Sequence, residues 1–312
     1  MGEIDEVASG LQFPEGPVAM PDGSVLVVEM FGPRITRIRP DGATETVAEI
    51  PGGPNGLAIG PDGAGYLCNN GGCFTPVDLG DLVLPGPFDP ERYTGGRIQR
   101  VDLDSGEVTD LYTHCDGRPL RAPNDIVFDA HGGFYVTDHG YSDLDARVAQ
   151  VTGIYYAQPD GSEIREVVFP AASPNGIGLA PDGATLYWAE TMHGRLMQRA
   201  VTGPGEVGGP TMGPSDCLHG LPGMQLLDSL AVDGAGNVCV ATLINGGITV
   251  VSPGGDLVEF LAIDDPLTTN ICFGGADLST AFITASSTGR LLRVTWPRPG
   301  APLHGASPAT AS

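Results

Sequence analysis

Short apolar runs alternate with turn residues along the whole chain, and one such pattern occurs six times. Each copy begins with an acidic or amide residue, enters an apolar run, turns at Gly and Asp, and enters a second apolar run. Period-two alternation and β-branched residues favour strands in these runs, and no stretch has a sustained helical period. The copies begin at Glu15, Asn55, Asn124, Asn175, Asp228 and Asn270.

The spacing of the copies predicts the architecture. Their starting points lie roughly 40 to 70 residues apart, a spacing that brackets the length of a four-stranded β-propeller blade. Third and fourth apolar runs follow most copies, such as residues 33–40 and 45–50 after the first. We therefore predict an all-β fold. It is a single six-bladed β-propeller over residues 1–297, with four antiparallel strands in each blade.

The two ends of the chain have different expected roles. The sixth copy has a third apolar run that ends at Trp296, but no fourth run follows it. Residues 3–9 can supply this outermost strand, and pairing them there would remove two open sheet edges. Residues 298–312 are rich in Pro, Gly, Ala and Ser, and we expect them to form a disordered tail.

Loop lengths distinguish the two faces of the predicted propeller. If the first strand of each blade lines the central channel, the tight Pro-Asp-Gly turns, such as residues 21–23, lie together on one face, the turn face. The other connections lie on the opposite face, the loop face. The long ones are residues 71–95, 114–123, 139–152 and 209–227. Because long loops on a rigid frame usually carry function, we place the functional site on the loop face.

Composition and charge narrow the set of partners. The chain has 41% hydrophobic and 17% charged residues, and its formal net charge is -23. Such a charge repels phosphate backbones and anionic lipids, which argues against nucleic acid or a membrane as partner and favours a small-molecule substrate. The start of the chain lacks the features of a signal peptide, so we expect a cytoplasmic protein. Nothing in the pattern indicates an oligomeric state.

The six cysteines are predicted to be free thiols. Cys68, Cys239 and Cys272 lie inside strand-like runs, and no Cys-x-x-Cys pair is present. A lone cysteine in an apolar run usually packs as a small hydrophobic residue.

The first residues of the six copies are the strongest candidates for chemistry. They occupy equivalent positions at the channel, and all six are carboxylate or amide side chains. Asn before a strand is ordinary turn chemistry for any one copy, but its recurrence around one axis favours a cation site. We predict one divalent cation, with Ca²⁺ first and Zn²⁺, Mg²⁺ or Mn²⁺ also open.

Four motifs carry a resemblance to a known family. The segments FPEGP, APND, SPNG and LDSLAVD resemble the SMP-30/gluconolactonase/LRE-like family of calcium-dependent lactonases, over about residues 10–295. The resemblance implies that Glu15, Asn175 and Asp228 bind the metal, and that Asn124 is a fourth ligand or a substrate contact. It also implies hydrolysis of sugar lactones and related cyclic esters, with Asp228 as both ligand and general base.

One departure from the family pattern bears on the substrate. In sugar-acting members an Arg commonly stands two residues before the Asn of the third blade, whereas this chain has Ala122 there and Arg121 beside it. The loop at residues 74–93 adds aromatic and aliphatic side chains, among them Phe74 and Tyr93, to the loop face. Both features favour a lactone less polar than a sugar lactone.

Lactone opening also needs proton transfer, for which two histidines are candidates. His139 and His193 follow the second strands of the third and fourth blades, although a solvated loop position is the plainer interpretation of each. Asp138 and Glu190 end the same strands and are expected to be turn or supporting groups. By strand alternation, Asp125 should point away from the channel axis.

Other functions remain open on the same frame. Neither a Gly-x-Ser-x-Gly elbow nor a His-Glu-x-x-His helix is present, which leaves serine hydrolase and zinc protease chemistry without an anchor. Arylester or phosphotriester hydrolysis, or a non-hydrolytic step, would use the same cation. A non-enzymatic propeller with a structural ion that binds a protein partner is a further alternative.

Overall fold

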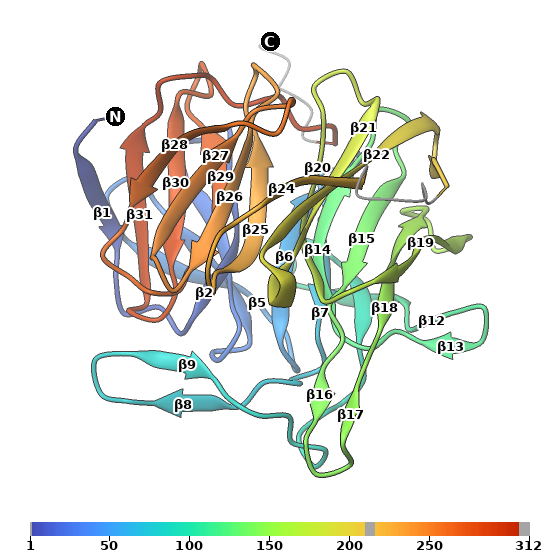
Figure 1. Ribbon diagram of the computed structural model, residues 1–312. Helices are drawn as coiled ribbons and strands as arrows, with labels where there is room; N and C mark the ends of the chain where they lie inside the picture. The colour runs from blue at the N-terminus through green and yellow to red at the C-terminus, as the bar shows by residue number, and fades with distance from the viewer. Residues whose placement is uncertain (1, 210–215, 306–312) are drawn as a thin grey trace.

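The computed structural model, which describes residues 2–209 and 216–305, is a six-bladed β-propeller, as predicted. Six antiparallel sheets stand around a common axis (Figure 1). Helical structure within the described residues is limited to the 3-10 turn η1 (Thr191–His193) and to the 3-10 conformation of Asp216. No helix in that part of the chain is long and apolar enough to cross a membrane.

Each blade begins at the channel and adds strands outward. Blade 1 contains β2 (Pro14–Ala19), β3 (Val25–Glu29), β4 (Arg34–Ile38) and β5 (Thr44–Glu49). Blade 2 contains β6 (Pro54–Ile59), β7 (Gly65–Asn69), β10 (Arg97–Val101) and β11 (Val108–Tyr112). Blade 3 contains β14 (Pro123–Phe128), β15 (Phe134–Asp138), β18 (Thr152–Ala157) and β19 (Ile164–Ala171).

The second half of the ring follows the same order. Blade 4 contains β20 (Pro174–Leu179), β21 (Thr185–Glu190), β22 (Arg195–Gly203) and β24 (Cys217–Gly220), with the short β23 (Glu206–Val207) also paired to β22. Blade 5 contains β25 (Leu226–Val232), β26 (Val238–Leu243), β27 (Gly247–Val251) and β28 (Leu257–Ala262). Blade 6 contains β29 (Thr268–Gly274), β30 (Thr280–Ala285), β31 (Arg290–Thr295) and β1 (Ile4–Ala8).

The N-terminal strand closes the ring, as predicted. Strand β1 pairs antiparallel with β31, with Asp5 opposite Arg293. Ala8, the last residue of this strand, and Leu11 pack in a buried cluster with Val25 and Leu291. The first and last parts of the propeller are therefore joined both by backbone hydrogen bonds and by a shared apolar core.

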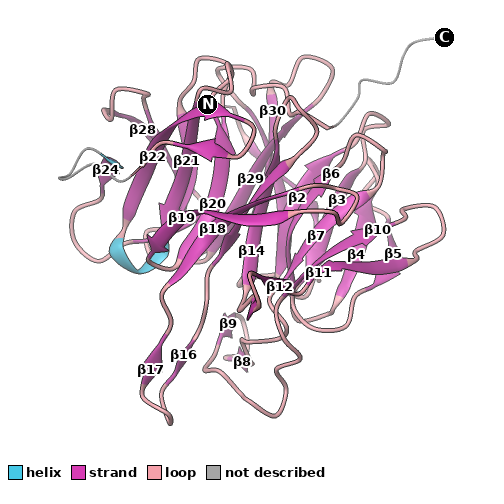
Figure 2. Cartoon of the chain, turned by 90° about the vertical axis from the view of Figure 1, so that its right-hand side faces the viewer, coloured by secondary structure: helices cyan, strands magenta, loops and turns pink. Residues whose placement is uncertain are grey.

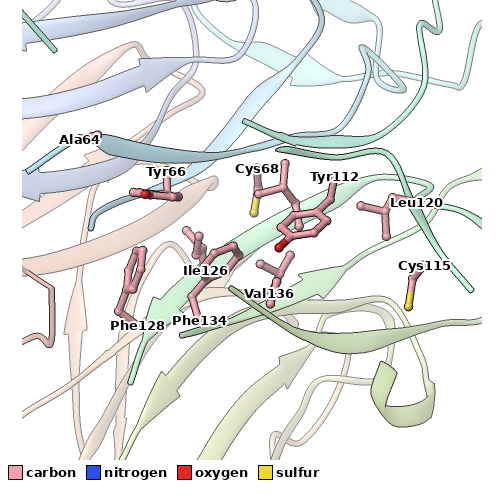
Figure 3. Packing of buried hydrophobic residues seen from close by; sticks show 12 residues of the cluster. Ala64, Tyr66, Cys68, Tyr112, Cys115, Leu120, Ile126, Phe128, Phe134 and Val136 are labelled. Carbon is pink, nitrogen blue, oxygen red and sulfur yellow. The ribbon is translucent and has the colours of Figure 1, made fainter. Parts of the chain in front are cut away.

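Apolar side chains fill the spaces between neighbouring blades. Figure 3 shows the cluster between blades 2 and 3, where the rings of Tyr66 and Phe128 meet edge to face at 5.1 Å between centroids. Phe134 lies 5.8 Å from Tyr66 in the same cluster. All six cysteines are free, as predicted; five are buried and Cys217 is half-buried.

The long connections gather on the loop face. The hairpins β8–β9 (Pro76–Asp78, Val83–Pro85) and β16–β17 (Ser142–Asp143, Val148–Ala149) project from the same end of the propeller (Figures 1 and 2). The short hairpin β12–β13 (His114–Cys115, Arg118–Pro119) precedes blade 3. Residues 209–227 differ from expectation, because they contain β24, the fourth strand of blade 4, and only residues 221–225 connect blade 4 to blade 5. Residues 210–215 lie outside the described residues.

The C-terminal segment also differs from expectation. Residues 298–305 contact the propeller instead of forming a free tail, while residues 306–312 lie outside the described residues. The Arg298 side chain binds Asp233 at 2.7 Å and also Glu259, and Gly300 forms a β-bridge with Asp233. This segment lacks strand periodicity, but the Arg298 guanidinium holds it against the propeller by pairing with Asp233 and Glu259.

We predict that removing β1 destabilises the whole ring. Deletion of residues 1–9 should lower the melting temperature by more than about 5 °C, because it exposes the edge of β31 and opens a buried cluster. Asp5→Ala is the matched control, since Asp5 forms only an exposed ion pair with Arg293 and should shift the midpoint by less than about 2 °C. Equal melting curves for the deletion and the full chain would contradict closure by β1.

Candidate metal centre

The six inner strands place the predicted polar residues at the loop-face end of the channel. Strands β2, β6, β14, β20, β25 and β29 contact one another in ring order. Each of the six polar residues lies near the start of its strand and is only 3 to 8% exposed, and together we term them the polar ring. They are Glu15, Asn55, Asn124, Asn175, Asp228 and Asn270.

A β-bulge recurs beside the polar ring in every blade. Each pairing of an inner strand with its second strand shifts register by one residue at or next to the ring position. Such bulges redirect side chains and are common beside active sites. The repeated bulge explains how all six polar side chains can share one level of the channel.

Glycines after the ring residues let neighbouring inner strands touch. A Cβ at Gly16 would lie 2.5 Å from the carbonyl oxygen of Asn55, and one at Gly176 would lie 2.7 Å from that of Asp228. No side chain fits at these positions, so the backbones approach directly. In this structure, Asn-Gly therefore marks a close approach of strands.

Two ring oxygens have no protein partner. Glu15 Oε2 and Asn124 Oδ1 are buried without a hydrogen bond from any described residue. Asn270 differs, because its Oδ1 accepts the Ile271 N–H at 2.8 Å. The Asn175 Oδ1 lies 3.4 Å from the Ser229 hydroxyl. Buried polar atoms without partners are rare, and a cation would satisfy these two.

Burial also makes the ring carboxylates costly to ionise. Burial raises the pKa of Asp228 to about 7; the nearby Asp125 carboxylate adds to this shift, and a hydrogen bond from Asn175 opposes it. Burial and then the Asp228 charge raise the pKa of Glu15 well above its usual range. A bound cation would favour the ionised forms of both acids.

Asp125 lines the channel and does not point away from its axis, as strand alternation had predicted. It lines the channel cavity, and its carboxylate accepts the N–H groups of Ile126 at 2.9 Å and of Ile177, in blade 4, at 3.3 Å. The bulge between Pro123 and Ile126 breaks the alternation on which the prediction rested. Asp125 therefore braces blade 3 against blade 4, and burial raises its pKa to about 7.

Buried hydroxyl groups support Glu15, a feature that sequence reasoning missed. The Thr269 side chain hydrogen-bonds the Glu15 carboxylate. Its Oγ1 lies 2.9 Å from the Thr284 hydroxyl and 2.5 Å from the Ser286 hydroxyl, and Ser286 donates to the Pro14 carbonyl at 2.5 Å. In the sequence, the only sign of this role is that Thr269 immediately precedes Asn270, the ring residue of blade 6.

The donor set fits a hard cation better than a soft one. Among the described residues, no group of three or more His, Cys, Asp or Glu side chains is arranged to hold a metal. The polar ring instead offers two carboxylates and several amide oxygens. Calcium prefers oxygen ligands of this kind, whereas structural zinc sites use Cys and His.

The two predicted histidines occupy different environments on the loop face. His139 is buried, its Nδ1 lies 2.9 Å from the Gly140 carbonyl oxygen, and its ring meets Phe74 edge-on at 6.0 Å. Burial lowers the pKa of His139, which favours the neutral imidazole. The His193 side chain is 48% exposed and lies 3.3 Å from Glu190. Within the described residues, neither histidine hydrogen-bonds a member of the polar ring.

Acidic residues that end the second strands hold the loops leading into the inner strands. The Asp138 carboxylate accepts the backbone N–H groups of Arg121 and Ala122, both at 2.7 Å. Glu190 accepts the N–H of Ala172 at 3.2 Å. Both acids therefore support the approach to the ring, in line with their expected roles.

Aromatic side chains form a cluster on the loop face. Phe88 stacks on Tyr141 with ring centroids 4.0 Å apart, and Tyr93 meets both rings edge-on. The Tyr93 hydroxyl donates to the Arg121 carbonyl at 2.5 Å. We term Phe88, Tyr93 and Tyr141 the aromatic cluster; it joins the long loops of blades 2 and 3.

The blade 2 loop also reaches blade 6. The Val83 N–H, at the start of β9, donates to the Ser287 carbonyl oxygen at 2.9 Å. Figure 1 shows the β8–β9 hairpin extending beneath the blade that contains β31. Residues 71–95 therefore span part of the loop face between two blades that are not neighbours.

Comparison with known proteins assigns the family. The sequence pattern described as "SMP-30/Gluconolactonase/LRE-like region" matches residues 13–287. The chain belongs to this family. The matched region includes all six residues of the polar ring and both histidines, so the resemblance predicted from four motifs is confirmed over nearly the whole propeller.

Relatives with assigned names support the same placement. The chain is 31% identical to "Lactonase drp35" of Staphylococcus saprophyticus over 79% of its own length and 68% of that protein. It is 24% identical to the gluconolactonase of Zymomonas mobilis, over 91% of this chain and 79% of that one. The calcium-binding protein regucalcin from Agrobacterium tumefaciens has the same fold, with a TM-score of 0.75, 17% identity, and coverage of 98% of this chain and 97% of that one.

The raised pKa values predict how stability depends on pH. Asp228 and Asp125 titrate near pH 7 when folded, against about pH 3.9 when unfolded. Between these values the folded state binds more protons, so its stability falls as pH rises. EDTA-treated protein should melt at least a few degrees lower at pH 8 than at pH 5.

The same melting curves measured with calcium present provide the control for this prediction. It should raise the melting temperature at pH 8, where the acids are ionised, and much less at pH 5, where they are protonated. A metal-free melting temperature that rises from pH 5 to pH 8 would contradict the buried-acid interpretation of the ring.

Proposed function

We propose that the protein is a divalent-cation-dependent hydrolase that opens lactones, with Ca²⁺ as the cation. Glu15, Asn124, Asn175 and Asp228 would hold the ion. The observation that carries this proposal is the pair of buried ring oxygens without partners, Glu15 Oε2 and Asn124 Oδ1, beside a second buried acid. The relatives named lactonase and gluconolactonase support the reaction class.

The chain's own residues would position water and move its proton. A bound cation would act as a Lewis acid on the lactone carbonyl. Asp228 would take the proton of the attacking water, because it is one of the two carboxylates of the polar ring and the cation would keep it ionised. Asn175 orients Asp228 by donating a hydrogen bond to its carboxylate. Burial of the ring keeps other water away from these groups.

The two histidines are assigned to later proton transfer. His139 Nδ1 faces a carbonyl oxygen and therefore carries the proton, which leaves Nε2 as an acceptor. The His193 side chain is exposed and lies 3.3 Å from Glu190, which places it at the rim, where it would donate a proton to a departing alkoxide. Their separate environments make the two assignments testable one at a time.

The proposed substrate is a lactone with an apolar or aryl substituent. Ala122 is fully buried where a sugar-acting relative would present Arg, so no cation stands there to bind hydroxyl groups. The aromatic cluster and Phe74 line the neighbouring loops with flat apolar surface. Such surface binds apolar groups better than a polyhydroxylated ring.

The polar ring also argues against a purely structural ion in a non-enzymatic propeller. A structural site would use its protein ligands fully, whereas the Asn270 amide oxygen already accepts the Ile271 N–H and so leaves fewer ligands than calcium takes. Water or substrate would complete the coordination. Arylester and phosphotriester hydrolysis would need the same cation, and the substrate panel below separates them from lactone opening.

We predict that removing either ring acid weakens cation binding. Glu15→Gln and Asp228→Asn should each lower calcium affinity at least about tenfold in calorimetric titrations, since each removes one of two charges from the site. Asn270→Ala is the matched control, because its amide oxygen already accepts a backbone hydrogen bond. Calcium should also restore activity lost to EDTA. Stoichiometric zinc held by His or Cys would overturn the assignment.

We predict a preference for apolar lactones. In a calcium-loaded panel followed by proton release, aryl-bearing lactones should be opened with a higher kcat/KM than gluconolactone. Tyr141→Ala should reduce this preference mainly by raising KM, since it removes a stacked wall and no proposed ligand. Absence of opening for every lactone, with the cation bound, would refute lactone hydrolysis and favour the arylester or phosphotriester alternative.

A further inference from the structure

Between the polar ring and the turn face, the channel is lined mainly by apolar side chains. A cavity of about 110 Å³ occupies it, lined by the inner strands of all six blades. One apolar residue from each blade represents this lining: Val18, Leu57, Ile126, Ile177, Leu230 and Ile271. Residues 301–304 of the C-terminal segment complete the wall.

The C-terminal segment crosses this end of the channel. At its start, the Gly300 N–H donates to the Leu278 carbonyl of blade 6 and the Ala301 N–H to the Val232 carbonyl of blade 5, both at 2.9 Å. At its end, a Cβ on Gly305 would lie 2.5 Å from the Ile59 carbonyl of blade 2 and 3.3 Å from Phe128 of blade 3. Blades 5 and 6 stand opposite blades 2 and 3, so the segment spans the opening.

Charge anchors the start of the crossing. Asp233, at the turn-face end of β25, is fully buried and accepts a hydrogen bond from the Arg298 guanidinium at 2.7 Å. The same guanidinium binds Glu259 on β28. A buried carboxylate paired in this way holds its partner firmly, because separation would leave its charge uncompensated.

We propose that residues 298–305 form a seal, an internal ligand of the apolar channel that closes its turn-face mouth. The seal keeps water from reaching the polar ring from the turn face, on the side where Asp125 and Asn270 line the cavity. The loop face is then the route by which small molecules reach the ring. This inference goes beyond the proposed function, and it stands even if the ring binds no cation.

Cys272 is a built-in reporter of the seal. It lines the channel cavity, is 7% exposed, and burial raises its thiol pKa to about 12. Release of the seal should expose this thiol and increase its alkylation by iodoacetamide. Cys68 is the internal reference, because it is fully buried in the core between blades 2 and 3 and does not line the cavity.

Three substitutions in the full chain release the seal at separate points. Arg298→Gln removes the charged anchor, Gly300→Val places side-chain atoms against Phe273, and Gly305→Val does so against Ile59. Gly220→Val is the matched control, since a Cβ there meets no heavy atom within 4 Å. Alkylation of each cysteine is followed over time at pH 8 by peptide mass spectrometry.

The seal predicts a selective change. Cys272 should react at least about tenfold faster in Arg298→Gln and in one or both of the other two release variants, while Cys68 keeps its original rate and Gly220→Val changes neither. An unchanged Cys272 rate in Arg298→Gln or in both glycine variants would overturn the proposal. So would a parallel rise at Cys68, because the substitutions would then open the propeller as a whole.

Discussion

The inner strands of this propeller touch backbone to backbone at the level of the polar ring, and the site depends on that contact. Gly16 and Gly176 admit no side chain, because the carbonyl groups of the next blade occupy the space. The bulge in each inner strand then turns the adjacent polar side chain to a common level. A small displacement of one blade would therefore change the spacing of the oxygens that face one another across the channel.

The same arrangement stores unfavourable electrostatics. Glu15 and Asp228 are both buried; the Asp228 charge raises the cost of ionising Glu15, and the Asp125 charge raises that of ionising Asp228. Hydrogen bonds from Thr269 and Asn175 offset part of that cost but leave Glu15 Oε2 without a partner. This cost supports the proposed cation, because a bound cation would relieve the repulsion between the acids and give Glu15 Oε2 a partner.

Both ends of the chain close the propeller, one at the outer edge of a blade and the other at the central channel. Strand β1 completes the outside of blade 6, where it prevents the ring from opening along an unpaired edge. Residues 298–305 lie across the channel itself, held by Arg298. On the opposite face, Asp138 and Glu190 fix the backbone that enters blades 3 and 4. Rigid closure on one face and long, braced loops on the other give the propeller two distinct ends.

The sequence alone determined the number of blades, the closing strand, the free cysteines and the identity of the ring residues. These features follow from periodicity and spacing, which are local properties repeated six times. The roles of Glu15, Asn124, Asn175 and Asp228 as ligands, and of His139 and His193, remain predictions. The family resemblance, now confirmed, added the reaction class to what the residues themselves indicated.

Only the tertiary structure decided the direction of Asp125, the hydroxyl network around Thr269 and the position of residues 298–305. The Asp125 direction depends on a bulge that the neighbouring blade imposes, and strand alternation cannot reveal it. Arg298 is ordered by Asp233 and Glu259, which lie 65 and 39 residues away in the sequence. Contacts between such distant residues leave no periodic signal, because each involves one pair of side chains that only the closed ring brings together.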